Sequence, residues 1–248
     1  MKCNSLILGN GEIGSSLKKA LGKVDKSKKI KVLDNKDKNY TDLVNSLTCD
    51  VLHICYPYSD DFIDISYDYI VSFNPKLVII HSTVKVGTTE KIDKLVNENE
   101  KRFYVVHSPV RGQHPNLTES ILYFVKYIGT EEEAAYKLAK KELTGIKTKW
   151  VNNSKATELG KMLSTSYYGV CISWHREMKR LCDSFGVDFD DAVTDFNETY
   201  NVGYKKFRPN VIRPVLIPPE GDILGHCVKQ NSDLLQQQKK SKFLSLIK

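Results

Sequence analysis

The chain has 248 residues, of which 41% are hydrophobic and 27% charged, so it can bury a globular core and disorder is not expected. Its formal net charge of +7 suits an anionic ligand such as a nucleotide. The lysines are dispersed apart from the first forty residues and the tail, and no aromatic–basic motif accompanies them, which argues against nucleic acid as a partner.

The cysteines and the apolar segments bear on the compartment. None of the six cysteines forms a C-x-x-C pair or a metal-like spacing, a pattern typical of reduced, mostly buried thiols in a cytoplasm-like compartment. The N-terminus lacks the apolar region of a signal peptide, and no run of about 18 apolar residues is present to cross a membrane. We therefore expect a cytoplasmic protein with no metal site and no membrane partner.

The segment from Leu6 to Gly14 is an apolar run that ends in three glycines with the spacing G-x-G-x-x-G. A strand, a tight turn and a helix in this order bind a pyrophosphate, because the helix N-terminus offers free N–H groups and a partial positive charge. A second apolar run closes on Asp34, 23 residues after Gly11, near the place of an acid that holds the adenosine ribose 2′-hydroxyl. The alternative is a plain βαβ unit with a glycine-rich turn. The residues expected to hold the dinucleotide here are Gly9, Asn10, Gly11, Glu12, Ile13, Gly14 and Asp34.

Short apolar strands and amphipathic helices alternate through the first 151 residues. The alternation is typical of a parallel sheet with helices on both faces, in which ligands bind at the carboxyl ends of the strands. One expected helix starts with a cap on Ser59 and runs to Phe73. Strands are expected at 6–8, 29–33, 50–55, 77–80, 103–106, 121–128 and 146–151, and helices at 15–21, 41–47, 59–73, 88–97 and 131–143.

The residues that follow these strands are polar or turn-forming, which predicts a ligand site at that edge of the sheet. The histidines among them either belong to the site or only bond nearby backbone, and both readings stay open. The strand-end residues are Gly9, Asp34, Tyr56, Pro57, His81, Ser82, Thr83, His107 and Ser108.

A long helix follows residues 152–154, which are expected to cap it, and Gly186 is expected to end it. Apolar residues recur along it in steps of three and four over more than seven turns, which is the strongest helix pattern in the chain. We expect it to be the spine of a second domain and a contact surface in a homodimer. The apolar positions are Leu159, Leu163, Tyr167, Val170, Trp174, Met178, Leu181 and Phe185.

The predicted fold is therefore α/β: a Rossmann-type doubly wound parallel sheet, residues 1–151, followed by a smaller all-α domain, residues 152–248, built on one long helix. A second stripe on that helix comprises Glu158, Lys161, Thr165 and Tyr168. A lysine in such a stripe is usually solvated, and it becomes a catalytic candidate if the stripe faces the cofactor.

Several segments resemble the NAD-dependent UDP-glucose/GDP-mannose 6-dehydrogenases and their relatives, the 6-phosphogluconate and β-hydroxyacid dehydrogenases. The most specific is HSTVKVGTT at 81–89, which is similar to the family's S-T-V-x-x-G-T-T segment that contacts NAD. Residues 50–57 resemble the third strand with its trailing proline, residues 157–163 the start of the long helix, and residues 225–227 the G-H-C segment. The resemblance covers most of residues 1–235.

The resemblance implies NAD as cofactor, with Tyr56, Pro57, Ser82 and Thr83 beside it. It also implies that Lys161 lies near the reacting carbon and that Cys227 is the nucleophile. We assign Thr165 to a catalytic hydrogen bond. Arg111, Glu158 and His226 are assigned to a polar, anionic small-molecule substrate, with Arg111 clamping a carboxylate or phosphate. For Cys227 the alternative is a small buried hydrophobe.

The chain departs from this family on the substrate side. Thr165 stands where the family has asparagine, and Val110 where the sugar-nucleotide branch has glutamate. Residues 109–113 resemble the P-V-S-G-G loop of β-hydroxyacid dehydrogenases at least as closely, with Arg111 in place of serine. The chain also stops where the larger enzymes begin a third domain.

The leading hypothesis is a NAD-dependent dehydrogenase that oxidises the alcohol of a sugar, a sugar nucleotide or a hydroxyacid. A second is a catalytically reduced NAD-binding module that acts through a partner. A third is a structural domain whose basic tail, residues 239–242, docks onto an acidic partner.

Overall fold

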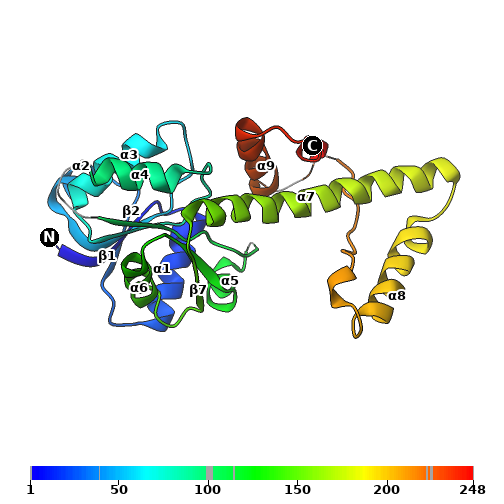
Figure 1. Cartoon of the computed structure of the whole chain (residues 1–248), viewed down its shortest axis with the longest axis horizontal. Coiled ribbons are helices and arrows are strands. Elements are labelled where there is room, and N and C mark those ends of the chain that lie inside the picture. The colour runs from blue at the N-terminus through cyan, green and yellow to red at the C-terminus, as the bar shows by residue number, and fades with distance from the viewer. Residues whose placement is uncertain are drawn as a thin grey trace. The chain divides into compact units, whose positions relative to one another are not determined.

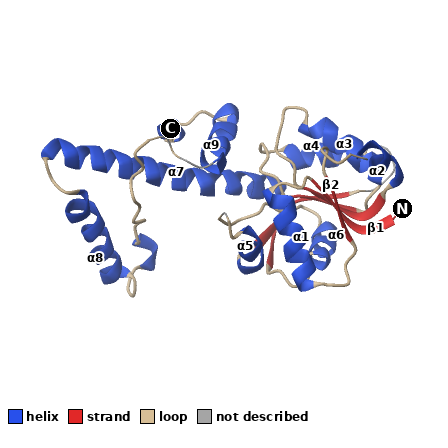
Figure 2. Ribbon diagram, turned by 180° about the vertical axis from the view of Figure 1, so that it is seen from behind, coloured by secondary structure: helices blue, strands red, loops and turns tan. Residues whose placement is uncertain are grey.

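The computed structural model describes residues 2–38, 40–98, 103–113, 115–221, 223 and 226–247. The chain divides into two compact units, Met1–Lys161 and Met162–Lys248. All the described strands belong to the first unit, and the described elements of the second are helices and loops (Figure 2).

The first unit is built on a seven-stranded sheet in the order β2-β1-β3-β4-β5-β6-β7. Every neighbouring pair is parallel except β5 and β6, which pair antiparallel through His107 and Gly129. The doubly wound sheet predicted from the sequence is confirmed, with this one antiparallel step. The strands are β1 (Lys2–Leu8), β2 (Ile30–Leu33), β3 (Thr48–Ile54), β4 (Leu77–Ile80), β5 (Tyr104–His107), β6 (Lys126–Gly129) and β7 (Thr148–Val151).

Helices cover both faces of the sheet, with α2, α3 and α4 along one face and α1, α5 and α6 along the other (Figure 1). Each buries an apolar stripe at helical spacing, as Leu17 and Leu21 of α1 do. Parallel strands between two helical layers are buried on both sides, which is why β4 is the uninterrupted apolar run from Leu77 to Ile80. The helices are α1 (Glu12–Val24), α2 (Tyr40–Ser46), α3 (Phe62–Phe73), α4 (Thr88–Val96), α5 (Leu117–Tyr123) and α6 (Glu133–Glu142).

Two local predictions are wrong. The strand expected at 121–128 is instead α5, which ends at Tyr123, followed by the short strand β6. Leu117 and Ile121 are four residues apart, and as a helix they both pack into the core with α1, which outweighs the strand preference of the apolar run. The helix expected from Ser59 begins at Phe62 after Asp61 and has no side-chain cap. Ser59 lies before the helix, in a turn in which its carbonyl oxygen accepts the N–H of Phe62 at 3.1 Å.

The long helix is confirmed as α7 (Ser154–Phe185), which has 32 residues. Its N-terminus is capped by Asn153, whose side-chain oxygen accepts the N–H of Lys155 at 2.8 Å. It ends at Gly186, which takes a φ of +67° that favours glycine. The unit boundary falls inside α7, after Lys161. In the described part of the second unit the α-helices α8 (Asp195–Tyr204) and α9 (His226–Gln238) follow, together with short π-helical and 3-10 segments.

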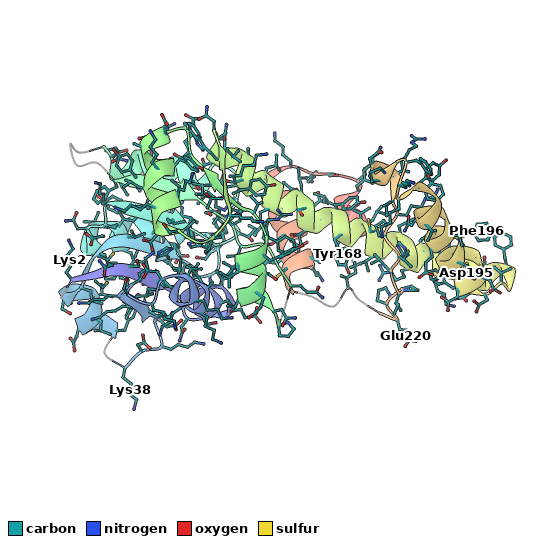
Figure 3. The ribbon with its side chains drawn as sticks, turned by 90° about the horizontal axis from the view of Figure 1, so that it is seen from below. Lys2, Lys38, Tyr168, Asp195, Phe196 and Glu220 are labelled. Carbon is teal, nitrogen blue, oxygen red and sulfur yellow. The ribbon has the colours of Figure 1, made fainter. Side chains whose placement is uncertain are left out.

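The apolar stripe on α7 is largely exposed in this chain. Leu163, Tyr167, Trp174 and Phe185 expose between 49% and 79% of their surface, and the neighbouring Tyr168 is exposed as well (Figure 3). Helix α8 carries the exposed Phe196 (Figure 3). No helix among the described residues is both long and apolar enough to span a bilayer.

The packing of α1 against β1 leaves no room for a side chain at Gly14. A Cβ built there would lie 1.9 Å from the carbonyl oxygen of Gly9, whereas one at Gly22, in the same helix, meets nothing within 4 Å. We expect Gly14→Ala to lower the free energy of unfolding by about 1–3 kcal/mol, because helix and turn must move apart. Gly22→Ala is the matched control and should raise it by about 0.5–1 kcal/mol. Urea denaturation measures both, and a Gly14→Ala protein as stable as the parent would contradict this packing.

Candidate functional site

The turn between β1 and α1 has the form of an anion site. Gly9 has a φ of +93°, and a Cβ there would lie 3.0 Å from the backbone nitrogen of Tyr56. Gly11 faces open space, since a Cβ there would meet nothing within 4 Å, and as the residue before α1 it provides no side-chain cap. The first N–H groups of a helix have no partner within the helix, so this N-terminus can receive a phosphate. Glu12 and Ile13 form the first turn of α1.

Asp34 follows β2 and reaches the glycine turn. Its Oδ2 accepts the N–H of Asn10 at 2.7 Å, and its Oδ1 accepts the N–H of Lys36 at 3.2 Å. The hydrogen bond from Asn10 lowers the pKa of Asp34, so the carboxylate is ionised near neutral pH. The sequence placed Asp34 and the turn at one edge of the sheet, and the structure joins them directly.

The ends of β3 and β4 are also linked to each other. The hydroxyl of Ser82 donates to the carbonyl oxygen of Tyr56 at 2.5 Å, and Pro57 lies exposed beyond it. The Tyr56 hydroxyl pairs with Ser66 of α3 at 2.7 Å, and burial raises its pKa. Tyr56 therefore offers backbone, rather than its hydroxyl, at the strand end. Thr83 is the half-buried residue that follows Ser82.

Glu158 fastens the start of α7 to the N-terminus of α4. Its carboxylate, which is fully buried, accepts the N–H of Gly87 at 2.6 Å, the N–H of Thr89 at 2.8 Å and the hydroxyl of Thr89 at 2.6 Å. A carboxylate at a helix N-terminus satisfies donors that the helix leaves unpaired. Burial raises the pKa of Glu158, while these donors favour its ionised form. The contact ties the 81–89 segment, which carried the family resemblance, to the helix that carries Lys161.

Lys161 lies within electrostatic reach of two buried groups, Lys126 and His107. Burial lowers the pKa of both groups most, and the charge of Lys161 lowers each pKa further. The pKa of Lys126 falls to about 7 and that of His107 to about 3. The ammonium of Lys126 donates to the carbonyl oxygens of Ser108 at 2.7 Å and Pro109 at 3.3 Å. Lys161 therefore lies beside a neutral histidine and a lysine that titrates near pH 7.

Arg111 follows β5 in the segment that begins at Ser108. Its guanidinium lies over the rings of Phe124 and Tyr127, at 5.4 Å and 5.5 Å from their centroids. Stacking on two aromatic rings orients the planar guanidinium without occupying its N–H donors. Gly112 follows with a φ of +149°, in the region that favours glycine.

The remaining predicted residues belong to the second unit. Cys227, in the first turn of α9, is an exposed free thiol. Thr165 lies on α7, and its hydroxyl oxygen accepts a hydrogen bond from the side-chain nitrogen of Asn231 at 3.2 Å. Gly225 and the side chain of His226 lie outside the described residues.

The structure thus brings together the glycine turn, Asp34 and the ends of β3 and β4 in the first unit, and it sets Lys161 near Lys126. Sequence reasoning missed Lys126 and Asn231. A lysine inside the apolar run at 121–128 was the available sign of the first, whereas Asn231 gave none, since its partner is 66 residues away. Among the residues that the structure describes, no three His, Cys, Asp or Glu side chains gather as metal ligands.

The sheet, the glycine turn and the helical second unit define a Rossmann-like fold with an added helical region. Comparison with known proteins confirms the resemblance to sugar-nucleotide dehydrogenases, although no family model matches the chain. Two curated relatives are UDP-N-acetyl-D-mannosamine dehydrogenases. The protein from Methanocaldococcus jannaschii is 27% identical over 157 residues, and the one from Pyrococcus horikoshii is 28% identical over 174 residues.

The chain is shorter than these relatives. The matches cover 62% and 67% of this chain but only 34% and 39% of the relatives, so the matched part of the chain spans little more than a third of their length. A solved structure of UDP-D-ManNAc dehydrogenase from Pyrococcus horikoshii superposes with a TM-score of 0.74 at 24% identity, covering 100% of this chain and 66% of that one. The 3-hydroxyisobutyrate dehydrogenase of Mycobacterium tuberculosis superposes with a TM-score of 0.71 at 14% identity and covers 99% and 91%. These two structures show the shared fold.

The buried Lys126 gives the stability of the first unit a dependence on pH. Its pKa is about 7 in the folded protein against 10.5 ordinarily, so between these values the unfolded chain binds one more proton and stability rises with pH. We expect the free energy of unfolding of the parent, relative to Lys126→Met, to rise by about 1.4 kcal/mol per pH unit across this window and to be constant below it. Denaturation from pH 6 to about 10 measures the difference. Lys137→Met on the surface of α6 is the control, and a difference independent of pH would contradict the lowered pKa of Lys126.

Proposed function

We propose that the chain is a NAD-dependent dehydrogenase that oxidises the alcohol of a polar, anionic substrate, either a sugar nucleotide, a sugar or a hydroxyacid. The observation that carries the proposal is the open N-terminus of α1 behind the glycine turn, with the Asp34 carboxylate bonded to Asn10 beside it. The printed names of the relatives, UDP-N-acetyl-D-mannosamine dehydrogenase and UDP-glucose 6-dehydrogenase, support it.

The residues present fit NAD. The turn from Gly9 to Gly14, with Asn10, Glu12 and Ile13, would hold the pyrophosphate, and Asp34 would accept the ribose 2′-hydroxyl. Asp34 favours NAD over NADP because an ionised carboxylate repels a 2′-phosphate. The strand-end residues Tyr56, Pro57, Ser82 and Thr83 would line the same edge. Bound NAD supplies the hydride acceptor, and the chain supplies position and charge.

Lys161 is proposed to orient the substrate oxygen, to stabilise the negative charge that develops on it and to accept its proton. A lysine serves as a base when burial disfavours its charged form. Thr165 would add a hydrogen bond. Arg111 would clamp a carboxylate or phosphate, with its guanidinium already oriented by the two rings. We also propose that Glu158 and His226 contribute to substrate binding. Glu158 would do so indirectly, by holding the 81–89 segment in place.

Cys227 is proposed as the nucleophile if the oxidation removes four electrons, since its thiol is exposed at the start of α9. The alternative function is a catalytically reduced NAD-binding module that acts through a partner. Two substitutions favour it, Thr165 in place of the family's asparagine and Val110 in place of glutamate.

The first expected outcome is NAD binding, measured by calorimetry and by the rise in melting temperature at millimolar NAD. Asp34→Ala should lower the affinity for NAD about 10- to 100-fold, because it removes a hydrogen bond to a charged group. It should also reduce the ratio of the affinity for NAD to the affinity for NADP. Asp42→Ala, an exposed acid on α2, makes the same charge change and should leave the affinity unaltered. If NAD does not change the melting temperature, both the enzyme hypothesis and the NAD-binding module hypothesis are wrong.

The same protein is then screened for NADH formation with UDP-sugars, GDP-mannose, 6-phosphogluconate and 3-hydroxyacids. Lys161→Ala should lower turnover at least about 100-fold while NAD still binds. Cys227→Ser should halt a four-electron oxidation after its first hydride transfer and leave a two-electron oxidation intact. Turnover of Lys161→Ala at the parent rate would overturn the assignment, and NAD binding without any turnover would favour the module.

We further propose that the protein is a cytoplasmic homodimer that pairs through α7. All six cysteines are free thiols, as in a reducing compartment. The stripe from Leu163 to Phe185 leaves four large apolar side chains about half or more exposed, and a symmetric contact between two copies would bury it. Sedimentation equilibrium should give twice the chain mass, and Trp174→Glu at the centre of the stripe should give the monomer. A monomeric parent protein would refute the dimer.

A further inference from the structure

A chain of buried polar groups runs between the sheet and α6, in an otherwise apolar layer. His53 of β3 and His81, after β4, are 0% and 1% exposed, and Glu142 of α6 is 8% exposed. His53 Nε2 lies 3.0 Å from Glu142 Oε1, His53 Nδ1 lies 2.9 Å from His81 Nε2, and His81 Nδ1 lies 2.9 Å from the carbonyl oxygen of Ser108. Each of these three contacts needs one hydrogen.

The donor-to-acceptor direction of these hydrogen bonds is set at Ser108, because a carbonyl oxygen can only accept a hydrogen bond. His81 must therefore carry a hydrogen on Nδ1, and as a neutral ring it has a lone pair on Nε2. The hydrogen between the two rings then belongs to His53 Nδ1. That leaves His53 Nε2 facing the carboxylate of Glu142, and a neutral ring has no hydrogen left for this contact. Three contacts need three hydrogens, whereas two neutral imidazoles supply two.

The environment decides where the third hydrogen is held. Glu142 Oε1 also accepts from Ser5 at 2.8 Å and pairs with Lys28 at 2.9 Å, and these two donors stabilise the carboxylate independently of His53. Glu142 is therefore ionised. Burial lowers the pKa of His81 well below its ordinary value, and the nearby charge of Lys126 lowers it further. His81 is therefore neutral, and the hydrogen falls to His53.

We propose that His53 is an imidazolium in the folded protein, held between Glu142 and His81, and that it acts through His81 as a positioning residue for Ser108 and the segment that carries Arg111. The Ser108 carbonyl receives His81 on one side and the Lys126 ammonium on the other. The importance of Arg111 rests on the proposed function, whereas the charge of His53 does not.

The Glu142 end of this line of hydrogen bonds lies next to a hollow in the surface. Glu142 and Lys28 line an open hollow of about 570 Å³ with Asp25, Asp50 and Lys141, among others. This hollow lies at the amino ends of β3 and β4, where Val51 and Leu77 line it, away from the glycine turn. The charged and titratable groups around His53 are Glu142 and Lys28 at this end and His81, His107, Lys126 and Cys55 towards the other.

Nitrogen-15 NMR of the full chain labelled at histidine tests the proposal near neutral pH, without NAD or substrate. We expect both ring nitrogens of His53 to be protonated and only Nδ1 of His81, with assignments from the spectrum of His53→Gln. His107 is the matched control. Its Nε2 faces the Ser82 carbonyl at 3.2 Å and its Nδ1 the Thr157 hydroxyl at 2.8 Å. Burial lowers the pKa of His107 to about 3, so that ring should be neutral, with the hydrogen of the Thr157 hydroxyl shared between Nδ1 and the Ser154 carbonyl oxygen, which lies 2.8 Å from the hydroxyl. A single protonated nitrogen on His53 would overturn the proposal.

Glu142→Gln removes the negative charge beside His53, and its amide nitrogen can donate to His53 Nε2. That nitrogen cannot accept from Ser5 or pair with Lys28 as Oε1 does, so the variant keeps the contacts from His53 to Ser108 and loses those two. In this variant His53 should show one protonated ring nitrogen in the same spectrum, and two protonated nitrogens would overturn the proposal.

Hydrogen exchange tests the positioning role. In His53→Leu, which removes the hydrogen bonds between Glu142 and His81, the backbone amides of Val110 and Arg111 should exchange at least about tenfold faster than in the parent. In Glu142→Gln, which keeps the hydrogen bonds from His53 to Ser108, they should exchange within about twofold of the parent rate. Equal exchange in folded His53→Leu would remove the positioning role. If no assay shows NADH formation, the proposed function fails but the proposal for His53 is unaffected. Neither the NMR spectrum nor the hydrogen exchange measurement depends on turnover.

Discussion

The close contact between Gly14 and the carbonyl of Gly9 governs the rest of the first unit. With no room for a Cβ, α1 lies directly against the end of β1 and its N-terminus opens where the strand stops. The same geometry lets Gly9 pass beside the backbone of Tyr56 and lets Asp34 reach the N–H of Asn10. One steric constraint thus gathers the ends of three strands around an electropositive helix terminus, which is what a nucleotide site requires.

A second constraint comes from the polar groups buried under α6. Buried charges are costly unless they are paired, and the pairing here is directional. Glu142, His53 and His81 form a line that ends on the Ser108 carbonyl, where Lys126 also donates. This line crosses an apolar layer and connects the amino ends of the strands with the segment that precedes Arg111. The polar side chains in this layer therefore act on the shape of the site rather than forming its surface.

Some parts of the fold could be read from local pattern because local pattern dictates them. The glycine spacing, the apolar run from Leu77 to Ile80 and the period of α7 each reflect a single element and its burial. The strand expected at 121–128 failed because Leu117 and Ile121 pack as a helix against α1, a contact that no local window contains. For the same reason the partners of Glu158 and Asn231, which lie 66 to 71 residues away, could not be foreseen.

The sequence by itself determined the alternation of strands and helices apart from α5, the anion-binding turn and the edge of the sheet at which a ligand site would form, because these follow from residue spacing and from the parallel direction of most of the strands. Only the tertiary structure decided which buried groups meet: Glu158 with the N-terminus of α4, Lys126 with Ser108, and His53 with Glu142. Hydrogen-bond direction and local charge depend on those meetings. The protonation of a histidine or a lysine is therefore a property of the folded chain and not of its position in the sequence.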